Sequence, residues 1–471
     1  MPKDFLPKLP PIVHELAELF TANNFELALV GGPVRDLLLG RKAPDLDFTT
    51  NAYPDDIIAV VKNWADNLWE IGKEFGTIAL EKAGEQIEIT TYRAEKYDSA
   101  SRKPVVSFGT KLEEDLVRRD FTVNALAIKL PTGELIDVTN GKADLAAKIL
   151  RTPDNPEASF DDDPLRIMRA ARFVSQLPGF IVDDTTLTAM SQMRERLKIV
   201  SNERIRDELV KLICGANPVA GIEVMRKTGL LKVVLPEVAE LQLGMKKGYH
   251  HKDIYAHTMT VLRQAIDLET AENGSCPTPD FILRFAALMH DIGKPATRKF
   301  EKNGVVSFYH HDLVGAKLTR NRMRELRFDK KTTKKVSRLV ELHLRFFGYA
   351  DGAWSDAGVR RYVTDAGDLL EYLHRITRAD VTTKNKRKAQ KLNDAYDDLE
   401  YRITELKEKE ELDAVRPDLN GHEIMKILDI RPGPVLGKAY NYLLKVRLDK
   451  GPLSKVEATD YLKKWWSENN E

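Results

Sequence analysis

The sequence has few cysteines, no long apolar run and almost no net charge, and each shortage excludes a class of protein. Two of the 471 residues are cysteine, Cys214 and Cys276, which excludes a disulfide framework and a cysteine-rich zinc site. No stretch reaches the roughly 18 apolar residues that a membrane helix needs. The N-terminus mixes prolines with charges where a signal peptide would have an apolar core. We therefore expect a cytoplasmic protein with no membrane-spanning segment.

The formal net charge is only +1, so the whole chain has no long-range field that would attract nucleic acid. An RNA partner would have to be held by local basic surface. Two clusters could supply it, although each could equally be the solvated face of a helix. They are Lys330, Lys331, Lys334, Lys335 and Arg338, and Lys384, Lys386, Arg387, Lys388 and Lys391.

The distribution of patterns along the chain predicts a small mixed α/β domain followed by helices. Residues 25 to 130 alternate short β-rich runs, such as ELALVGG and QIEITTYRA, with helical stretches. After about residue 150 helical periodicity takes over, with Ser201 as a plausible helix start. Residues 392 to 406 form an amphipathic pattern too short for a coiled-coil dimer, so we expect this helix to pack on its own chain.

A nucleotide-binding and metal-binding pattern lies near the N-terminus. Gly31 and Gly32 end a β run, and Arg35 follows at the start of a helix, where backbone N–H groups can approach a phosphate. Asp45 and Asp47 then stand two residues apart in a β run, so their carboxylates point to the same side. Such a pair can hold the divalent metals that phosphoryl transfer requires. The signatures of P-loop ATPases and of dinucleotide-binding enzymes are both missing.

Five segments together resemble the class II tRNA nucleotidyltransferases, the family of CCA-adding enzymes and bacterial poly(A) polymerases. They cover residues 27 to about 215 in family order. The segments are Gly31 to Asp36 with Asp45 and Asp47; Arg118, Arg119, Asp120, Phe121, Thr122, Asn124 and Ala125; Asp137, Gly141, Asp144 and Leu145; Asp162 to Arg166 with Arg169, Arg172 and Phe173; and Glu203 with Arg204. Asp162 departs from the family, where a glutamate is usual.

The resemblance implies a role for each matching residue. Asp45 and Asp47 would be catalytic and would hold Mg²⁺. The nucleotide would be bound by Gly31, Gly32, Arg35, Arg118, Arg119, Asp120, Asn124, Asp163, Arg166, Arg169 and Arg172. Arg118 and Arg119 could instead be a surface basic pair. Glu88 could be a third carboxylate at the metal or a solvated strand glutamate.

Chemistry explains how two side chains could select the base. Cytosine and adenine both present an exocyclic amine beside an unprotonated ring nitrogen, and uracil and guanine reverse that order. Asp163 accepting from the amine and Arg166 donating to the ring nitrogen would favour C and A without a template. Alternatively, Asp163 before a proline could simply cap a helix.

The polar loop from Arg93 to Phe108 resembles the loop with which the family switches from C to A, which argues against a CC-only enzyme.

A second metal site is predicted in the middle of the chain, at His257, the adjacent pair His290 and Asp291, and Asp380. Imidazole and carboxylate ligands suit Mg²⁺ or a divalent transition metal. The order of these residues resembles the HD superfamily of metal-dependent phosphohydrolases over about residues 245 to 385. An HD domain can also serve only as a scaffold, so hydrolysis stays open.

These patterns predict an α+β fold with a small mixed sheet of five strands in a polymerase-β-like nucleotidyltransferase head, followed by all-helical neck, body, HD and tail domains. The expected boundaries are 1–150 for the head, 151–245 for the neck, 246–385 for the HD domain and 386–471 for the tail. The expected function is addition of C, C and A to tRNA from CTP and ATP. The alternatives are an A-adding enzyme or poly(A) polymerase of the same family, and an HD phosphohydrolase with an RNA-binding head. The sequence leaves the oligomeric state open.

Overall fold

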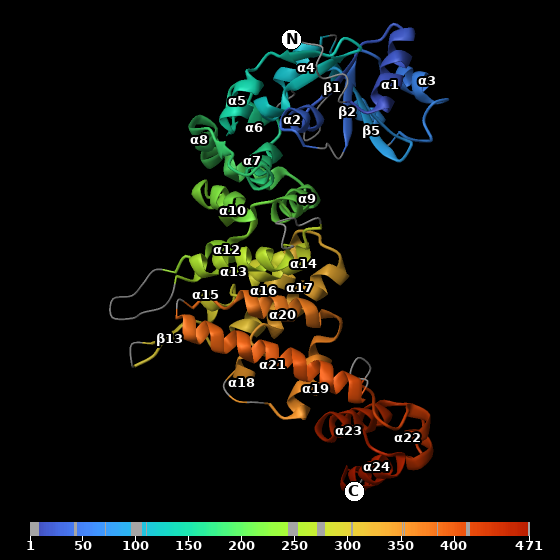
Figure 1. The fold of residues 1–471 in the computed structure, drawn as a ribbon, viewed down its shortest axis with the longest axis vertical. Helices are drawn as coiled ribbons and strands as arrows, with labels where there is room; N and C mark the ends of the chain where they lie inside the picture. Colours follow the sequence, from blue (N-terminus) through green and yellow to red (C-terminus); the bar gives the residue numbers. More distant parts are fainter. Residues whose placement is uncertain are drawn as a thin grey trace. The chain divides into compact units, whose positions relative to one another are not determined.

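The computed structural model describes residues 9–41, 45–70, 72–95, 106–109, 111–243, 253–270, 278–302, 305–350, 352, 354–383, 385–410 and 415–469. The chain divides into two compact units, residues 1–234 and 235–471 (Figure 1). Among the described helices, none is long and apolar enough to cross a membrane. Cys276, His250, His251 and Lys384, together with residues 96–105 of the polar loop, lie outside the described residues.

The first unit is built on a seven-stranded mixed sheet of order β3-β4-β5-β2-β1-β8-β9. β2 and β5 are parallel, and the other neighbours are antiparallel. The strands are β1 (Leu27–Val30), β2 (Leu46–Thr50), β3 (Asn67–Trp69), β4 (Thr77–Lys82), β5 (Glu85–Thr91), β8 (Leu126–Leu130) and β9 (Glu134–Asp137). The five predicted β runs are β1, β2, β4, β5 and β8. The expectation of five strands was wrong because two short edge strands, β3 and β9, extend the sheet.

Strand alternation gives the sheet two different faces. Leu27 and Leu29 of β1 belong to the main core, which also contains side chains from α1 (Pro11–Ala22) and α3 (Pro54–Val61). These two helices lie together beside the sheet in Figure 1. Ala28 and Val30 point to the opposite face and pack with α4 (Leu112–Val117). α2 (Gly32–Leu38) follows β1 directly.

Helices follow the head within the first unit, as the periodicity predicts. They are α5 (Gly141–Ala147), α6 (Pro156–Asp162), α7 (Leu165–Gln176), α8 (Asp184–Met193), α9 (Asn202–Ile213), α10 (Pro218–Lys227) and α11 (Leu231–Val234). A two-stranded parallel sheet, β10 (Ile149–Leu150) with β11 (Ile181–Val182), interrupts them. Ser201 is the N-cap of α9, and its side chain accepts a hydrogen bond from the backbone N–H of Arg204, which confirms the predicted helix start.

The described residues of the second unit are helical apart from one short hairpin, β12 (Lys299–Phe300) with β13 (Val306–Ser307). Its helices are α12 (Pro236–Ala239), α13 (Ile254–Glu269), α14 (Phe281–Met289), α15 (Lys294–Thr297), α16 (His311–Glu325), α17 (Lys330–Leu342), α18 (Phe347–Ala350), α19 (Asp356–Ala366), α20 (Leu370–Ala379), α21 (Lys386–Glu410), α22 (Gly421–Leu428), α23 (Pro434–Lys450) and α24 (Lys455–Asn469). α21 buries Tyr396, Leu399, Ile403 and Leu406 against its own chain, as expected.

Candidate functional site

The predicted head carboxylates gather on the face of the sheet that turns away from the main core. Leu46 and Phe48 of β2 point into that core, so Asp47 between them points to the other face. Asp47 pairs in register with Glu88 of β5, and Asp45 lies exposed one residue before β2. Burial, together with the charges of Glu88 and Asp45, raises the pKa of Asp47 to about 6, although Arg119 opposes the shift.

This cluster of carboxylates fits a divalent cation. Its oxygens are the hard ligands that Mg²⁺ and similar ions take. Burial is the main cause of the raised pKa of Asp47, and the negative charges of Glu88 and Asp45 add to it. A cation there would replace the proton, so the donor set and the electrostatics agree.

The glycine turn lies close to Arg119. Gly31 has a φ of +73°, a conformation that strains other residues. A Cβ at this position would stand 3.1 Å from Nη1 of Arg119. Nη2 of Arg119 donates to Asp115 at 3.1 Å. The structure therefore brings two predicted nucleotide-binding motifs, 88 residues apart in the sequence, to one place.

Arg35 of α2 is buried and is held by two neighbours. Its guanidinium forms a two-pronged interaction with Asp36, with both hydrogen bonds 3.0 Å long. Its Nη1 donates to Oδ1 of Asn124 at 2.8 Å. Three of its nitrogens thus face protein acceptors, an arrangement that holds Asn124 in place beside the glycine turn.

Asn124 continues the network to Asp120. Its amide donates to Oδ1 of Asp120 at 3.0 Å, and Nε of Arg169 on α7 donates to Oδ2 at 2.8 Å. Burial alone would raise the pKa of Asp120, but the charge of Arg169 and the hydrogen bond from Asn124 lower it to about 2. Asp120 is therefore a carboxylate at neutral pH, and it connects the head to α7.

Arg172 is fixed by a residue that sequence reasoning missed. Its Nη1 donates to Glu208 of α9 at 3.0 Å, and its guanidinium lies 4.3 Å from the centre of the Phe173 ring. Burial and the charge of Arg169 lower the pKa of Arg172 to about 10. Glu208 carried no recognisable signal because it is one acidic residue on a charged helix, and only folding places it opposite two arginines.

Both side chains predicted to read the base lie at the start of α7. One oxygen of Asp163 accepts from the backbone N–H of Leu165 at 3.1 Å, as the capping interpretation requires. Its other oxygen accepts from Arg204 at 3.1 Å, and this bond fixes the orientation of the carboxylate, as recognition of a base requires. Arg166 donates to Oγ of Ser159 at 2.8 Å and to the carbonyl of Arg118 at 2.7 Å.

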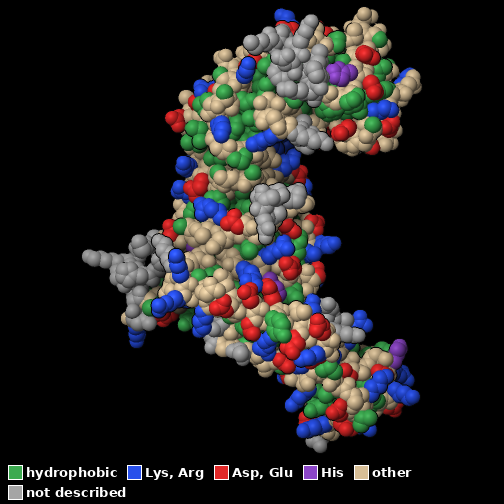
Figure 2. All heavy atoms as spheres, viewed as in Figure 1, with side chains coloured by type: hydrophobic (Ala, Val, Ile, Leu, Met, Phe, Trp, Pro, Cys, Tyr) green, Lys and Arg blue, Asp and Glu red, His purple; other side chains and the backbone are tan. Residues whose placement is uncertain are grey.

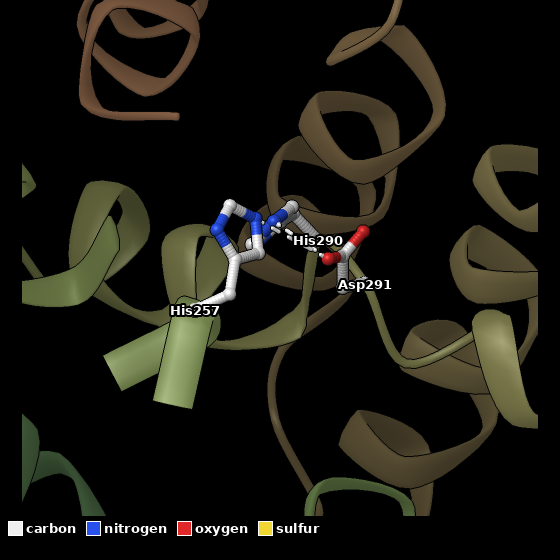
Figure 3. Close-up of side chains that lie close together, drawn as sticks. All are labelled: His257, His290 and Asp291. Atoms are coloured by element: carbon white, nitrogen blue, oxygen red, sulfur yellow. Dashed lines mark ion pairs between the residues drawn. The ribbon is translucent and has the colours of Figure 1, made fainter. Parts of the chain in front are cut away.

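The second predicted metal site is a cluster of helix ends in the second unit. His257 is on α13, His290 and Asp291 follow α14, and Asp380 follows α20. Figure 3 shows the side chains of His257, His290 and Asp291 lying close together. Nε2 of His257 is 3.0 Å from Oδ1 of Asp380 and 3.5 Å from Oδ2 of Asp291. All four predicted residues are therefore brought together.

The structure adds two histidines to this cluster, His311 at the start of α16 and His343 at the end of α17. Asp291 lies between two groups of candidate ligands, and within each group the ligand atoms are less than 4.8 Å apart. Its Oδ2 is 3.3 Å from Nε2 of His290, and its Oδ1 is 3.4 Å from Nε2 of His311. Two ligands of one metal ion are about 3–4 Å apart, given bonds near 2 Å. Asp291 is thus placed to bridge two ions.

Backbone carbonyls orient the three buried histidines toward the centre of the cluster. The Nδ1 atoms of His290, His311 and His343 lie 2.8, 2.8 and 2.6 Å from the carbonyl oxygens three residues earlier. A carbonyl accepts only, so each Nδ1 carries a proton, and Nε2 is the ring atom that would bind a metal ion. These Nε2 atoms are buried, and within the described residues none has a hydrogen-bond partner. Unsatisfied buried nitrogens aimed at a carboxylate fit metal ligands.

The electrostatics of this cluster agree with that interpretation. Burial and the neighbouring His290 lower the pKa of His343 to about 4, so its ring is neutral at pH 7. Burial opposes ionisation of Asp291, but His290 and Lys294 hold its pKa well below the usual value. Nζ of Lys294 lies 2.6 Å from Oδ2 of Asp291. Asp291 is therefore ionised, which is the form in which a carboxylate binds a metal ion.

Of the two added histidines, the sequence could have suggested only one. His311 stands in a region crowded with histidines, but His343 is a single histidine within an amphipathic helix, where core packing is the commoner role. The signal that both share is their burial at helix ends beside Asp291, which becomes visible only after folding.

Comparison with known proteins agrees with this geometry. Three family models match the chain: the poly A polymerase head domain at residues 27–151, the probable RNA and SrmB-binding site of polymerase A at 179–242, and the HD domain at 254–385. Among solved structures, the Bacillus stearothermophilus CCA-adding enzyme in complex with CTP aligns with a TM-score of 0.69 at 22% identity, covering 98% of this chain and 99% of that one. The Thermotoga maritima CCA-adding enzyme complexed with tRNA aligns with a TM-score of 0.60 at 21% identity, covering 97% and 96%.

Relatives by sequence fall into two groups. The CCA-adding enzyme of Enterococcus faecalis is 37% identical over 267 residues, which are 56% of this chain and 63% of that enzyme. The A-adding tRNA nucleotidyltransferase of Deinococcus radiodurans is 33% identical over 456 residues, which are 94% of this chain and 96% of that protein. Because this likeness runs through almost the whole of both chains, the chain belongs to the tRNA nucleotidyltransferase family.

Proposed function

We propose that this chain adds C, C and A to the 3′ end of tRNA, using CTP and ATP. The observation that carries the proposal is the position of Asp47 beside Glu88 and close to Asp45, on the sheet face near the glycine turn and Arg119. Nucleotidyl transfer needs carboxylates for divalent metals and cations for the triphosphate at one place. Relatives named for CCA addition support the choice of substrates.

Each residue would have a distinct role. Asp45 and Asp47 would hold Mg²⁺, the ion that we propose for the head, and Glu88 would adjoin it. These carboxylates would hold the divalent metal that supplies charge neutralisation at the triphosphate and activation of the attacking 3′-hydroxyl. Arg119, whose Nη1 lies close to Gly31, would contact the triphosphate. Arg35 would act mainly by positioning Asn124, because its guanidinium already binds Asp36 and Asn124.

Base selection would use Asp163 and Arg166 at the start of α7. Arg204 already holds one oxygen of Asp163, so the carboxylate is fixed rather than free to rotate. For Arg166 to donate to a base, it would have to exchange at least one of its bonds to Ser159 or to the carbonyl of Arg118. Each base that lacks the matching amine would leave polar groups unpaired, at a cost of roughly 1–3 kcal/mol.

Addition of A alone is the second candidate within the family. The relative that matches 94% of this chain is named A-adding, whereas the CCA-adding enzyme of Enterococcus faecalis matches 56% of it. The test uses purified protein with two tRNAs, one lacking the whole CCA end and one ending in CC. Incorporation of CTP into the first tRNA supports CCA addition. Incorporation of ATP only, and only into the tRNA ending in CC, would assign the chain as A-adding.

A phosphohydrolase activity of the HD domain is a further proposal, separate from nucleotide addition. It is favoured by Asp291, whose two oxygens face two groups of ligands. Divalent metals, either Mg²⁺ or transition metals, would supply a nucleophilic water and neutralise the charge of a phosphoester. We also propose the cytoplasm as the compartment, since the proposed substrates are tRNA and nucleoside triphosphates. Hydrolysis of bis(p-nitrophenyl) phosphate with added Mg²⁺, Mn²⁺ or Ni²⁺ tests the activity.

A further inference from the structure

A cavity with a basic rim lies between α16 and α17, apart from the metal cluster. Its volume is about 540 Å³. Thr333 and Ser337 are its buried small residues, and the half-buried ring of Phe328 lies beside them. Five cations line it: Arg320 and Arg324 from α16, and Lys330, Lys334 and Arg338 from α17.

The positive charge of this rim is largely uncompensated. The only acidic residue in the lining is Glu341, and Arg338 donates to it at 2.6 Å. Within the described part of the chain, the four other cations of the rim form no ion pair with a carboxylate. Elsewhere the two signs are mixed, as Figure 2 shows for the face in view, and the net charge is only +1. Four unpaired cations at one place therefore indicate an anionic partner.

The spacing of the cations favours a polyanion over a small ligand. Lys330, Lys334 and Arg338 follow one face of α17, and eight residues of helix span about 12 Å. A pocket for a small molecule usually has a few polar groups that converge on one point. A row of cations along a helix instead matches successive phosphates of a nucleic acid strand.

The aromatic ring strengthens the case for RNA. Phe328 stacks against Phe281 at a centroid distance of 5.2 Å, which fixes its orientation at the cavity. Proteins that hold single-stranded or looped RNA combine a basic groove with aromatic rings on which a base can stack. Both parts are present on one helical hairpin of the second unit.

We propose that the cavity between α16 and α17 is a tRNA-docking groove, in which Arg320, Arg324, Lys330 and Lys334 bind the phosphate backbone. The groove deepens the proposed function, on which it rests, because it assigns a binding surface for the substrate outside the head. It would contribute affinity for tRNA and no chemistry.

The test compares two double variants that change the net charge equally. Lys330→Glu/Lys334→Glu alters the groove, and Lys317→Glu/Lys331→Glu alters exposed lysines of the same two helices that do not line it. All four lysines are exposed, and Lys330 and Lys331 are in the first turn of α17, where acidic residues suit the helix dipole, so both variants should fold, which melting curves verify. The affinity for tRNA lacking its 3′ end is measured by filter binding from 50 to 300 mM KCl, and the KM and kcat of nucleotide addition are measured beside it.

We expect the groove variant to bind tRNA at least tenfold more weakly than the control at about 0.15 M salt, where charges are screened beyond about 8 Å. Its salt dependence should be shallower by about one unit of slope per lost phosphate contact. KM for tRNA should rise while kcat stays unchanged. Equal tRNA affinity of the two variants would overturn the proposal, as would a groove variant that loses affinity for CTP or ATP and keeps it for tRNA. A wild-type protein that binds tRNA but adds no nucleotide would contradict the proposed function, and the binding comparison would still decide the groove.

Discussion

Arg169 on α7 donates from Nε to Oδ2 of Asp120 at 2.8 Å, and this half-buried ion pair connects two segments that are 49 residues apart. The other oxygen of Asp120 accepts from Asn124, which in turn accepts from Arg35. The connection therefore runs from α7, which begins with the proposed base-reading residues, to α2, which follows the glycine turn. A displacement of either helix would be transmitted through Asp120 and Asn124 to the other.

The Asp120 pair predicts a dependence of stability on acid. The pKa of Asp120 is about 2 in the folded protein and about 4 when unfolded, so its ionised form favours folding. This contribution, on the order of 2 kcal/mol, is complete above about pH 5 and is lost as the pH falls toward 2. Asp120→Asn should therefore be less stable than the wild type at pH 6, and the difference should shrink as the pH falls to 3. Urea denaturation of both proteins at each pH measures this difference in the free energy of unfolding. A difference that does not change with pH would contradict the lowered pKa of Asp120.

The head carboxylates predict a loss of chemistry without a loss of RNA binding. Asp47→Asn keeps the shape of the side chain but removes its charge, and several kcal/mol of metal-dependent stabilisation corresponds to a rate at least about 100-fold lower. Asp45→Asn should act in the same direction. Affinity for tRNA should change little, because it comes from basic surface. Glu134→Gln, an exposed carboxylate of β9 in the same sheet, is the matched control. Nucleotide addition near the wild-type rate in either aspartate variant would refute the metal assignment.

Much of the head could be predicted from the sequence because short-range patterns, such as strand alternation and a glycine pair, determine it. The alternation of β2 fixes the direction of Asp47, and the glycine pair marks the turn before α2. The order of strands could not be predicted in this way. β2 and β5 are parallel neighbours although β3 and β4 come between them in the chain. The pairing of Asp47 with Glu88 depends on that register, which is why the role of Glu88 stayed open.

Interactions of long range explain the remaining omissions. Glu208 meets Arg172 only because α7 and α9 pack together, and His343 reaches Asp291 only because α17 ends beside α14. Glutamate is common on a charged helix and a single histidine is common on an amphipathic one, so neither residue type indicates a functional role by itself. The short edge strands β3 and β9 were missed for another reason: their three and four residues are mostly exposed or half-buried and have no buried alternation.

The bridging position of Asp291 predicts two metal ions per chain in the HD domain. His257 belongs to one group of ligands and His343 to the other. Protein loaded with Mn²⁺ or Ni²⁺ and analysed for bound metal should therefore lose about one ion in His257→Ala and about one in His343→Ala, and both in Asp291→Ala. His422→Ala, at an exposed position of α22, is the control. Nucleotide addition should persist in all four well-folded variants. A wild-type content of one ion, which His257→Ala and Asp291→Ala remove and His343→Ala retains, would exclude the second ion.

Asp163 provides the sharpest test, because the structure gives it two partners at once. Its bond to the Leu165 N–H is a capping interaction, whose loss costs roughly 0.5–2 kcal/mol. Its position beside Arg204 and Arg166 suits recognition of an exocyclic amine. Asp163→Ala should lower the melting temperature whichever role dominates, so stability alone decides nothing.

Fidelity separates the two roles of Asp163. If the carboxylate reads the base, Asp163→Ala should incorporate UTP and GTP, since it no longer rewards an amine or repels a carbonyl oxygen. Asn155→Ala is the matched control, because Asn155 caps α6 through a 3.0 Å bond to the Ala158 N–H and is not a proposed base-reading residue. It should lose comparable stability and still refuse UTP and GTP. Incorporation of all four nucleotides, measured beside melting curves for both variants, gives the answer: if Asp163→Ala behaves as Asn155→Ala does, Asp163 is a helix cap, and the choice of C and A must be made elsewhere.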